Sequence, residues 1–111
     1  MFLTDAERKV MVLVWKNGPQ TAKALAAELD VSANWRKTTS YTMITRCVEK
    51  GFLRREAPNF TCSAVVSQEE VAHRETEELL ENHFNGSASQ LVASLVEQNK
   101  LSLDELKALC K

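Results

Sequence analysis

Apolar residues in the first third of the chain recur at the three-to-four-residue spacing of amphipathic helices. Thr4 and Glu7 have the spacing of a capping box, which predicts a helix from that point to about Asn17. Gly18-Pro19 is expected to end this helix, because neither residue favours its continuation. The residues expected on its inward face are Ala6, Val10, Leu13 and Val14.

Two further helices are predicted after this break. Gln20-Thr21 could form a very short strand, and residues 30–36 read as a connection between the helices. The second helix is indicated by apolar residues at helical spacing, namely Ala22, Leu25, Ala26 and Leu29. The third helix is expected from about Lys37 to Lys50, with Gly51 following its end. Its inward face should carry Ser40, Met43, Ile44, Cys47 and Val48.

After Gly51 the spacing of apolar residues changes from the helical period to alternation, which predicts a small β-hairpin. Residues 52–56 form the first candidate strand, and Ala57-Pro58-Asn59 reads as a turn. Phe60, Cys62 and Ala64 then alternate with polar residues, which is the pattern of a half-buried second strand.

Three more helices are predicted in the remainder of the chain. Ser67 and Glu70 have capping-box spacing and open a long helix that ends near Asn85-Gly86. Ser87 can cap the next helix, and Ser102 opens the last one. The predicted fold is therefore mainly α, with three helices and a hairpin in residues 1–66 followed by a helical region in residues 67–111.

The outer face of the third helix has an unusual composition. Four Thr, a Tyr and an Arg share it, although solvated helix faces more often carry Glu, Lys and Gln. A helix that enters the DNA major groove needs short side chains near the groove floor, and the Thr hydroxyl and methyl groups can contact base edges there. Cations at the helix start and on the hairpin could contact phosphates. The candidate DNA-binding residues are Trp35, Arg36, Lys37, Thr38, Thr39, Tyr41, Thr42, Thr45, Arg46, Arg54 and Arg55.

The net charge of −1 conceals an asymmetry between the two halves. Residues 1–66 hold ten Lys and Arg against six Asp and Glu, whereas residues 67–111 hold four against nine. A basic half joined to an acidic half indicates that the first binds a polyanion.

The acidic half is expected to join two chains. Its short helices each have one apolar stripe, which is too little surface to form a core alone. The candidate dimerisation residues are Leu79, Leu80, Phe84, Leu91, Val92, Leu95, Leu106 and Leu109. Folding of these helices back onto the N-terminal half is the alternative.

Other classes of function find little support. The chain has no Gly-rich phosphate loop and no nucleophile elbow, so we expect no enzyme and no cofactor. His73, Glu77 and His83 do not have the spacing of a metal signature, so no metal site is expected. No signal peptide or apolar run long enough to cross a bilayer is visible, which predicts a cytoplasmic protein without membrane insertion. The cysteines are expected to be reduced and structural.

Three stretches resemble the penicillinase-repressor family, which includes BlaI, MecI and CopY. They are "LTDAERKVMVLVWKNGPQTAKALAAEL", "NWRKTTSYTMITRCVEKGFLRRE" and "LVASLVEQNKLSLDEL". The resemblance implies a winged-helix repressor that binds a palindromic operator as a homodimer, with residues 1–66 binding DNA and residues 67–111 pairing the chains. It also implies DNA contacts by Trp35, Lys37, Thr39, Thr42 and Arg46.

Two functional alternatives remain open at this point. The domain could be a winged-helix adaptor that docks a protein partner, or a thiol sensor that acts through Cys47 or Cys62. The inducing signal is also open. Ser94-Leu95 occupies the position where β-lactam-responsive members are cleaved by a regulatory protease at an Asn-Phe bond.

Overall fold

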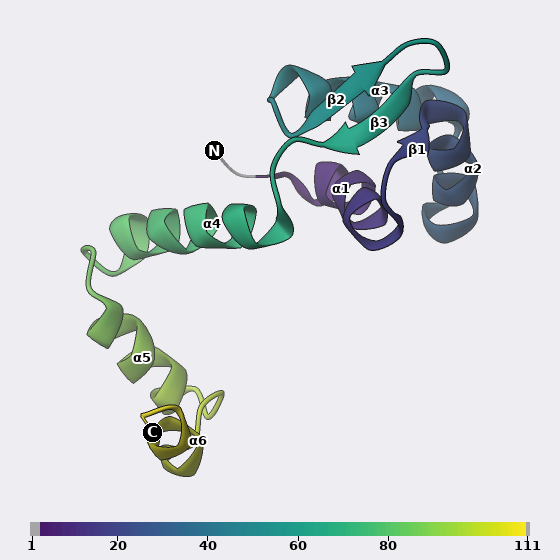
Figure 1. Ribbon diagram of the computed structural model, residues 1–111. Helices are drawn as coiled ribbons and strands as arrows, with labels where there is room; N and C mark the ends of the chain where they lie inside the picture. The colour runs from purple at the N-terminus through teal and green to yellow at the C-terminus, as the bar shows by residue number, and fades with distance from the viewer. Residues whose placement is uncertain (1–2, 111) are drawn as a thin grey trace. The chain divides into compact units, whose positions relative to one another are not determined.

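The computed structural model describes residues 3–110, and the chain divides into two compact units after Ala72 (Figure 1). The described elements are α1 (Asp5–Asn17), β1 (Gln20–Thr21), α2 (Ala22–Ala33), α3 (Lys37–Glu49), β2 (Leu53–Glu56), β3 (Thr61–Ala64), α4 (Gln68–His83), α5 (Ala88–Glu97) and α6 (Leu103–Leu109). This order confirms the predicted mainly helical fold with a small sheet. The domain boundary expected after residue 66 stays a prediction.

Side-chain caps define where the helices begin. The Thr4 hydroxyl oxygen accepts from Glu7 N at 3.2 Å, and Glu7 Oε1 accepts from Thr4 N at 2.9 Å, so the predicted capping box of α1 is complete. Helix α2 extends to Ala33 and does not end at Leu29. The sequence did not reveal its last turn, because that turn is largely exposed and has no apolar pattern. The predicted connection over residues 30–36 is therefore too long by about one helical turn.

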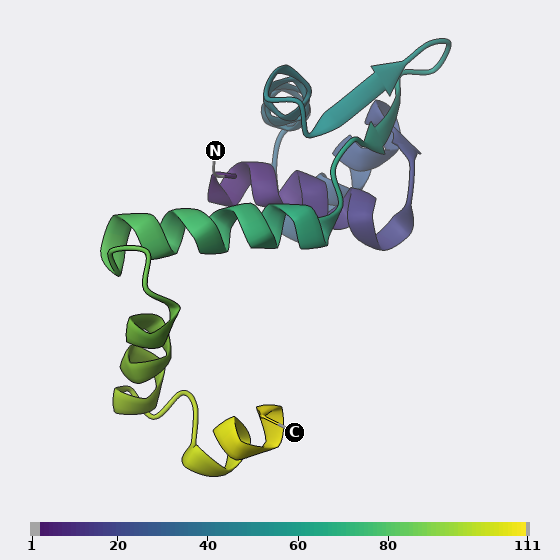
Figure 2. The same ribbon diagram turned by 60° about the vertical axis from the view of Figure 1, so that its left-hand side comes forward.

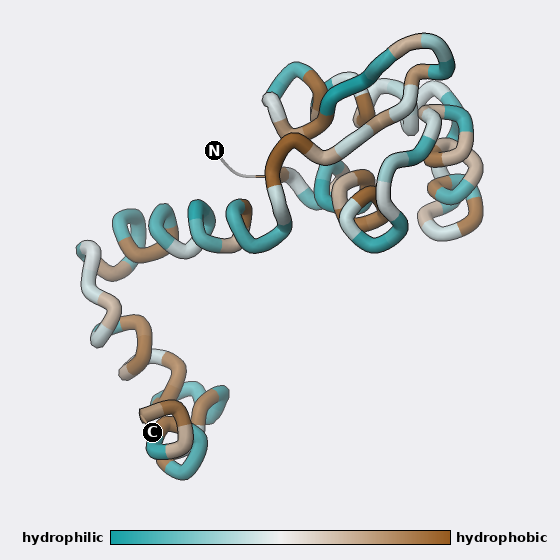
Figure 3. Tube along the Cα trace, in the orientation of Figure 1, coloured by the Kyte–Doolittle hydropathy of each residue, from teal (hydrophilic) through white to brown (hydrophobic). Residues whose placement is uncertain are grey.

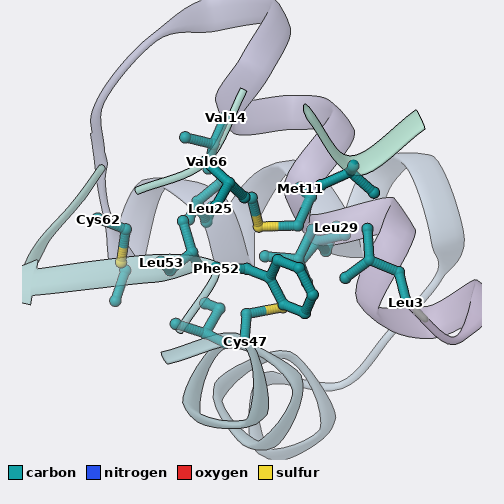
Figure 4. Packing of buried hydrophobic residues seen from close by; sticks show 14 residues of the cluster. Leu3, Met11, Val14, Leu25, Leu29, Cys47, Phe52, Leu53, Cys62 and Val66 are labelled. Atoms are coloured by element: carbon teal, nitrogen blue, oxygen red, sulfur yellow. The ribbon is translucent and has the colours of Figure 1, made fainter. Parts of the chain in front are cut away.

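The first unit has one hydrophobic core, drawn from α1, α2, α3, the sheet and the start of α4 (Figure 4). Figure 4 shows the Phe52 ring at its centre, with the sulfur of Cys47 lying against it. Val71, in the first turn of α4, is 2% exposed and belongs to this core. The buried members are Leu3, Val10, Met11, Val14, Ala22, Leu25, Leu29, Ile44, Cys47, Phe52, Leu53, Cys62, Val66 and Val71.

Two predicted inward faces need correction. In α1, Met11 and Glu7 are buried, whereas Ala6 and Leu13 are only half-buried. The apolar pattern missed Glu7 because a buried carboxylate looks like a surface residue in the sequence. In α3, Ser40, Ile44 and Cys47 are buried as predicted, while Met43 and Val48 are half-buried against the core.

The three strands form one antiparallel sheet in the order β1-β3-β2. Arg55 pairs with Cys62, and Gln20 pairs with Cys62 on the opposite side of β3. Figures 1 and 2 show the β2–β3 hairpin projecting beyond the helices, which is the wing of a winged helix. The prediction that Phe60 faces inward on a strand is wrong, because Phe60 lies in the turn with φ 52° and is 60% exposed.

The second unit consists of helical segments, and none of its residues from 73 to 110 is buried. Helices α5 and α6 contain no buried residue, although much of α5 consists of hydrophobic residues (Figure 3). Asn85 and Gly86 both have positive φ and end the turn after α4, as predicted. None of the helices in residues 3–110 combines the length and apolarity needed to cross a membrane.

Candidate nucleic-acid interface

The outer face of α3 presents the residues that the sequence singled out. Lys37, Thr38, Thr39, Thr42 and Arg46 are all exposed. Tyr41 and Thr45 are half-buried at the edges of the same face, and Tyr41 packs against the core. Trp35, just before the helix, is likewise half-buried against the core, so its ring is held in place while part of it stays accessible.

Three cations of this face are unpaired among the described residues. Within the part of the chain that the structure describes, the side chains of Arg36, Lys37 and Arg46 make no hydrogen bond or ion pair. Arg36 also leaves the start of α3 without a side-chain cap. Arg36, Lys37 and the free amide groups at the start of α3 therefore face solvent, as does Arg46 in its last turn, and this arrangement favours an anionic partner.

One hydroxyl has a defined orientation. Thr42 Oγ1 donates to the carbonyl oxygen of Thr38 at 2.8 Å. Because the hydroxyl proton is used inside the helix, the lone pairs that remain can only accept hydrogen bonds from outside. Thr42 is therefore suited to the amino groups of adenine or cytosine and, through its methyl group, to thymine.

Two hollows adjoin this face. One of about 360 Å³ is lined by Tyr41, Thr42, Thr45, Arg46 and Glu49. Glu49 is the last residue of α3, away from Arg36 and Lys37 at its start.

The second hollow, of about 380 Å³, lies between the starts of α2 and α3. Lys23 lines it together with Trp35, Arg36 and Lys37, and Asp30 is also present. Sequence reasoning missed Lys23. The signal was available, since a Lys in the first turn of the helix before a recognition helix lies near that helix's start.

The wing cations differ from those of α3 because both have partners. Arg54 Nε lies 3.0 Å from Glu56 Oε1, and the Arg55 guanidinium lies 5.7 Å from the centre of the Phe60 ring. Both arginines are exposed. They extend the basic surface, but they must exchange an existing contact for any new one.

A buried ion pair behind α3 was not foreseen from the sequence. Glu7 is 1% exposed, and its Oε1 lies 2.7 Å from the Nζ of Lys50, the C-cap residue of α3. Helical projection places Lys50 on the outer face, but its ammonium group turns back to α1. Burial raises the pKa of Glu7, but the hydrogen bonds from Lys50 and Thr4 outweigh it and hold the pKa below 4.5.

The thiols have the properties of structural cysteines. Burial raises the pKa of Cys47 to about 12, and it also raises the pKa of Cys62 despite the nearby Arg55. Because the thiolate is the reactive form, these environments argue against a thiol sensor at either position. In residues 3–110 there is no group of three or more His, Cys, Asp and Glu that could hold a metal ion.

Comparison with known sequences gives consistent relatives. The family model described as "Penicillinase repressor" matches residues 3–111. The methicillin resistance regulatory protein MecI of Staphylococcus aureus is 28% identical over 109 residues, which cover 96% of this chain and 89% of that protein. The penicillinase repressor of Bacillus licheniformis is 26% identical over 109 residues, covering 96% of this chain and 85% of the relative.

A solved structure supports the fold of the first unit. The solution structure of the DNA-binding domain of the repressor BlaI aligns with a TM-score of 0.57 and 26% sequence identity, covering 61% of this chain and 85% of that domain. The fold of the first unit is accordingly that of a winged helix. The relatives are repressors and not enzymes, in agreement with the sequence-based expectation. The family model spans nearly the whole chain, and the chain therefore belongs to the penicillinase-repressor family.

Proposed function

We propose that this chain is a DNA-binding transcriptional repressor that binds a palindromic operator as a homodimer. In each subunit α3 enters the major groove, and its Thr and Arg side chains contact base edges. The start of α3 and the wing contact the flanking phosphates. Bound in this way, the dimer blocks transcription until a signal releases it.

The observation that carries this proposal is the set of unpaired cations on the α3 face. Arg36, Lys37 and Arg46 have no partner among the described residues, whereas the half-buried cation Lys50 and the wing cation Arg54 do. A side chain that forms no intramolecular contact is free to neutralise a phosphate or reach a guanine edge. The family membership and the named DNA-binding domain of a relative support the same proposal.

The second unit supports the dimeric part of the proposal. The half-buried residues Leu91, Val92 and Leu95 share helix α5, which has no buried residue within one chain. Leu109 in α6 is 75% exposed. Apolar stripes of this kind are stabilised when a second chain covers them. The acidic charge of this half would also keep it off the phosphate backbone.

Selection from a random duplex library tests the proposal without knowledge of the operator. The full chain is incubated with the library at low ionic strength, and the retained duplexes are sequenced through successive rounds. We expect an inverted repeat whose half-site centres lie about 10 base pairs apart, or a multiple of that spacing. Retention without any enriched sequence, or no retention, would contradict the proposed function.

A further inference from the structure

We infer that Glu7 and Lys50 form a buried latch that fixes the orientation of α3, and that they are positioning residues for sequence readout although neither faces the DNA. The inference rests on the proposed function and adds two residues to it. Neither belongs to the exposed face of α3.

The latch joins the first turn of α1 to the last turn of α3. Glu7 Oε1 accepts from Lys50 Nζ at 2.7 Å and from Thr4 N at 2.9 Å. The carbonyl oxygen of Glu7 lies 3.8 Å from Cys47 Sγ, so the backbone of the same residue contacts the preceding turn of α3. One residue therefore sets both the start of α1 and the position of the α3 C-terminus.

The burial of Glu7 in this pair indicates a role in orientation rather than in stability alone. Glu7 is 1% exposed and the side chain of Lys50 is 31% exposed. A buried ion pair contributes little net stability over a well-packed apolar pair, because desolvation of the charges offsets their attraction. Its hydrogen bonds require one geometry, whereas apolar contacts between α1 and α3 tolerate small rotations.

A small rotation of α3 would matter for recognition. The helix has 13 residues and is therefore about 20 Å long, so a tilt of about 10° about its C-terminus moves its first turn by about 3 Å. Hydrogen bonds to base edges fail over much smaller displacements. Phosphate contacts by long, flexible cations would survive such a shift. Loss of the latch should therefore reduce sequence preference while sparing nonspecific binding.

The test is the double variant Glu7→Gln/Lys50→Met, which removes both charges with little change in shape or in net charge. Glu28→Gln is the matched control, because Glu28 bonds Asn17 at 3.3 Å, between α1 and α2, and lies outside the proposed interface. Affinity is measured for the selected operator and for a scrambled duplex. The temperature is one at which urea denaturation curves show that each protein is folded in the absence of urea.

We expect the ratio of operator affinity to scrambled-duplex affinity to fall at least about tenfold in the double variant. A fall of this size is measurable, since this ratio normally spans about 10³–10⁷. The affinity for the scrambled duplex should stay within about twofold of the original. The control should keep its ratio. A double variant that is folded and keeps the original ratio overturns the latch. If the double variant does not fold, Glu7→Gln alone carries the same comparison, because the half-exposed Lys50 can then turn to solvent and no unpaired charge is buried. Absence of sequence preference in the unmodified protein would instead contradict the proposed function.

Discussion

The two units of this chain differ in how their apolar residues are used. In the first, residues such as Leu25 and Leu29 have no exposed surface and pack in one core. In the second, α5 and α6 contain apolar side chains but no buried residue. A unit with a core can hold a recognition helix in a fixed place, whereas helices without a core are complete only against another surface.

The contrast explains the division of charge as well. The unit with the core carries the excess of Lys and Arg, and the other carries the excess of Asp and Glu. In the proposed repressor the basic excess of the first unit places cations on DNA, and the acidic excess of the second unit keeps the pairing region away from it.

The first prediction compares apolar residues of the two units. Leu25→Ala should lower the free energy of unfolding by about 2–5 kcal/mol, because Leu25 is fully buried and a cavity replaces it. Leu103→Ala should change it by less than about 0.5 kcal/mol, because Leu103 is 64% exposed. Urea denaturation measures both. Equal losses of unfolding free energy in the two variants would contradict the distinction between a unit with a core and a unit without one.

The second prediction concerns pairing through α5. Leu95→Asp should convert the proposed dimer to a monomer in sedimentation velocity and weaken operator binding by about 100-fold or more, since two linked half-sites give that order of avidity. Ala93→Asp is the control, because Ala93 is exposed on the same helix and receives the same charge. A dimer that survives Leu95→Asp but not Ala93→Asp would place the interface on the other face.

The third prediction contrasts a free cation with a partnered one. Arg46→Ala should weaken operator binding by about 1–3 kcal/mol if its guanidinium reads a base. Arg54→Ala should cost less than about 1 kcal/mol, because Arg54 must first leave Glu56 and lies on the wing. Fluorescence anisotropy with labelled operator measures both. A neutral Arg46→Ala would remove this residue from the readout.

The fourth prediction concerns the inner face of α3. Ser40 is fully buried, and its hydroxyl has no hydrogen-bond partner among the described residues. Ser40→Ala should therefore stabilise the protein by about 1 kcal/mol, because an unsatisfied buried hydroxyl is removed with little change in volume. Thermal denaturation followed by circular dichroism measures the change. A loss of stability would reveal a hydrogen bond to this hydroxyl.

The fifth prediction concerns acid. Because the folded-state pKa of Glu7 lies below 4.5, the carboxylate contributes stability above that pH and loses it as the pH falls through the folded value. Glu7→Gln should therefore be less stable than the original protein at neutral pH, and the difference should shrink in acid. Urea midpoints from about pH 7 to about pH 3 measure this. A difference that stays constant with pH would mean that the charge of Glu7 is not involved.

The sequence predicts the elements well where apolar period and caps coincide. The helix starts at Thr4, Ser87 and Ser102 carry the predicted capping side chains, and the apolar face of α2 is buried as expected. The last turn of α2 could not be predicted, since its exposed residues have no period. Phe60 was misplaced because nothing in the sequence distinguishes an exposed aromatic residue in a turn from a half-buried one in a strand.

The candidate site was predictable in composition but not in its supports. The exposed Thr and Arg residues follow from helical projection, whereas the Glu7–Lys50 pair joins residues 43 positions apart in the sequence. A buried carboxylate and its cation resemble surface residues until the packing of α1 on α3 is known. The hollow beside Lys23 likewise depends on how α2 and α3 meet.

The most direct test of the central claim is a titration of the selected operator with the full chain, in which stoichiometry and salt dependence are measured together. We expect two chains per duplex, and an affinity that falls with salt at a logarithmic slope of about −0.9 for each phosphate neutralised. A protein that stays monomeric and shows no affinity for the duplex in dilute buffer would contradict the account.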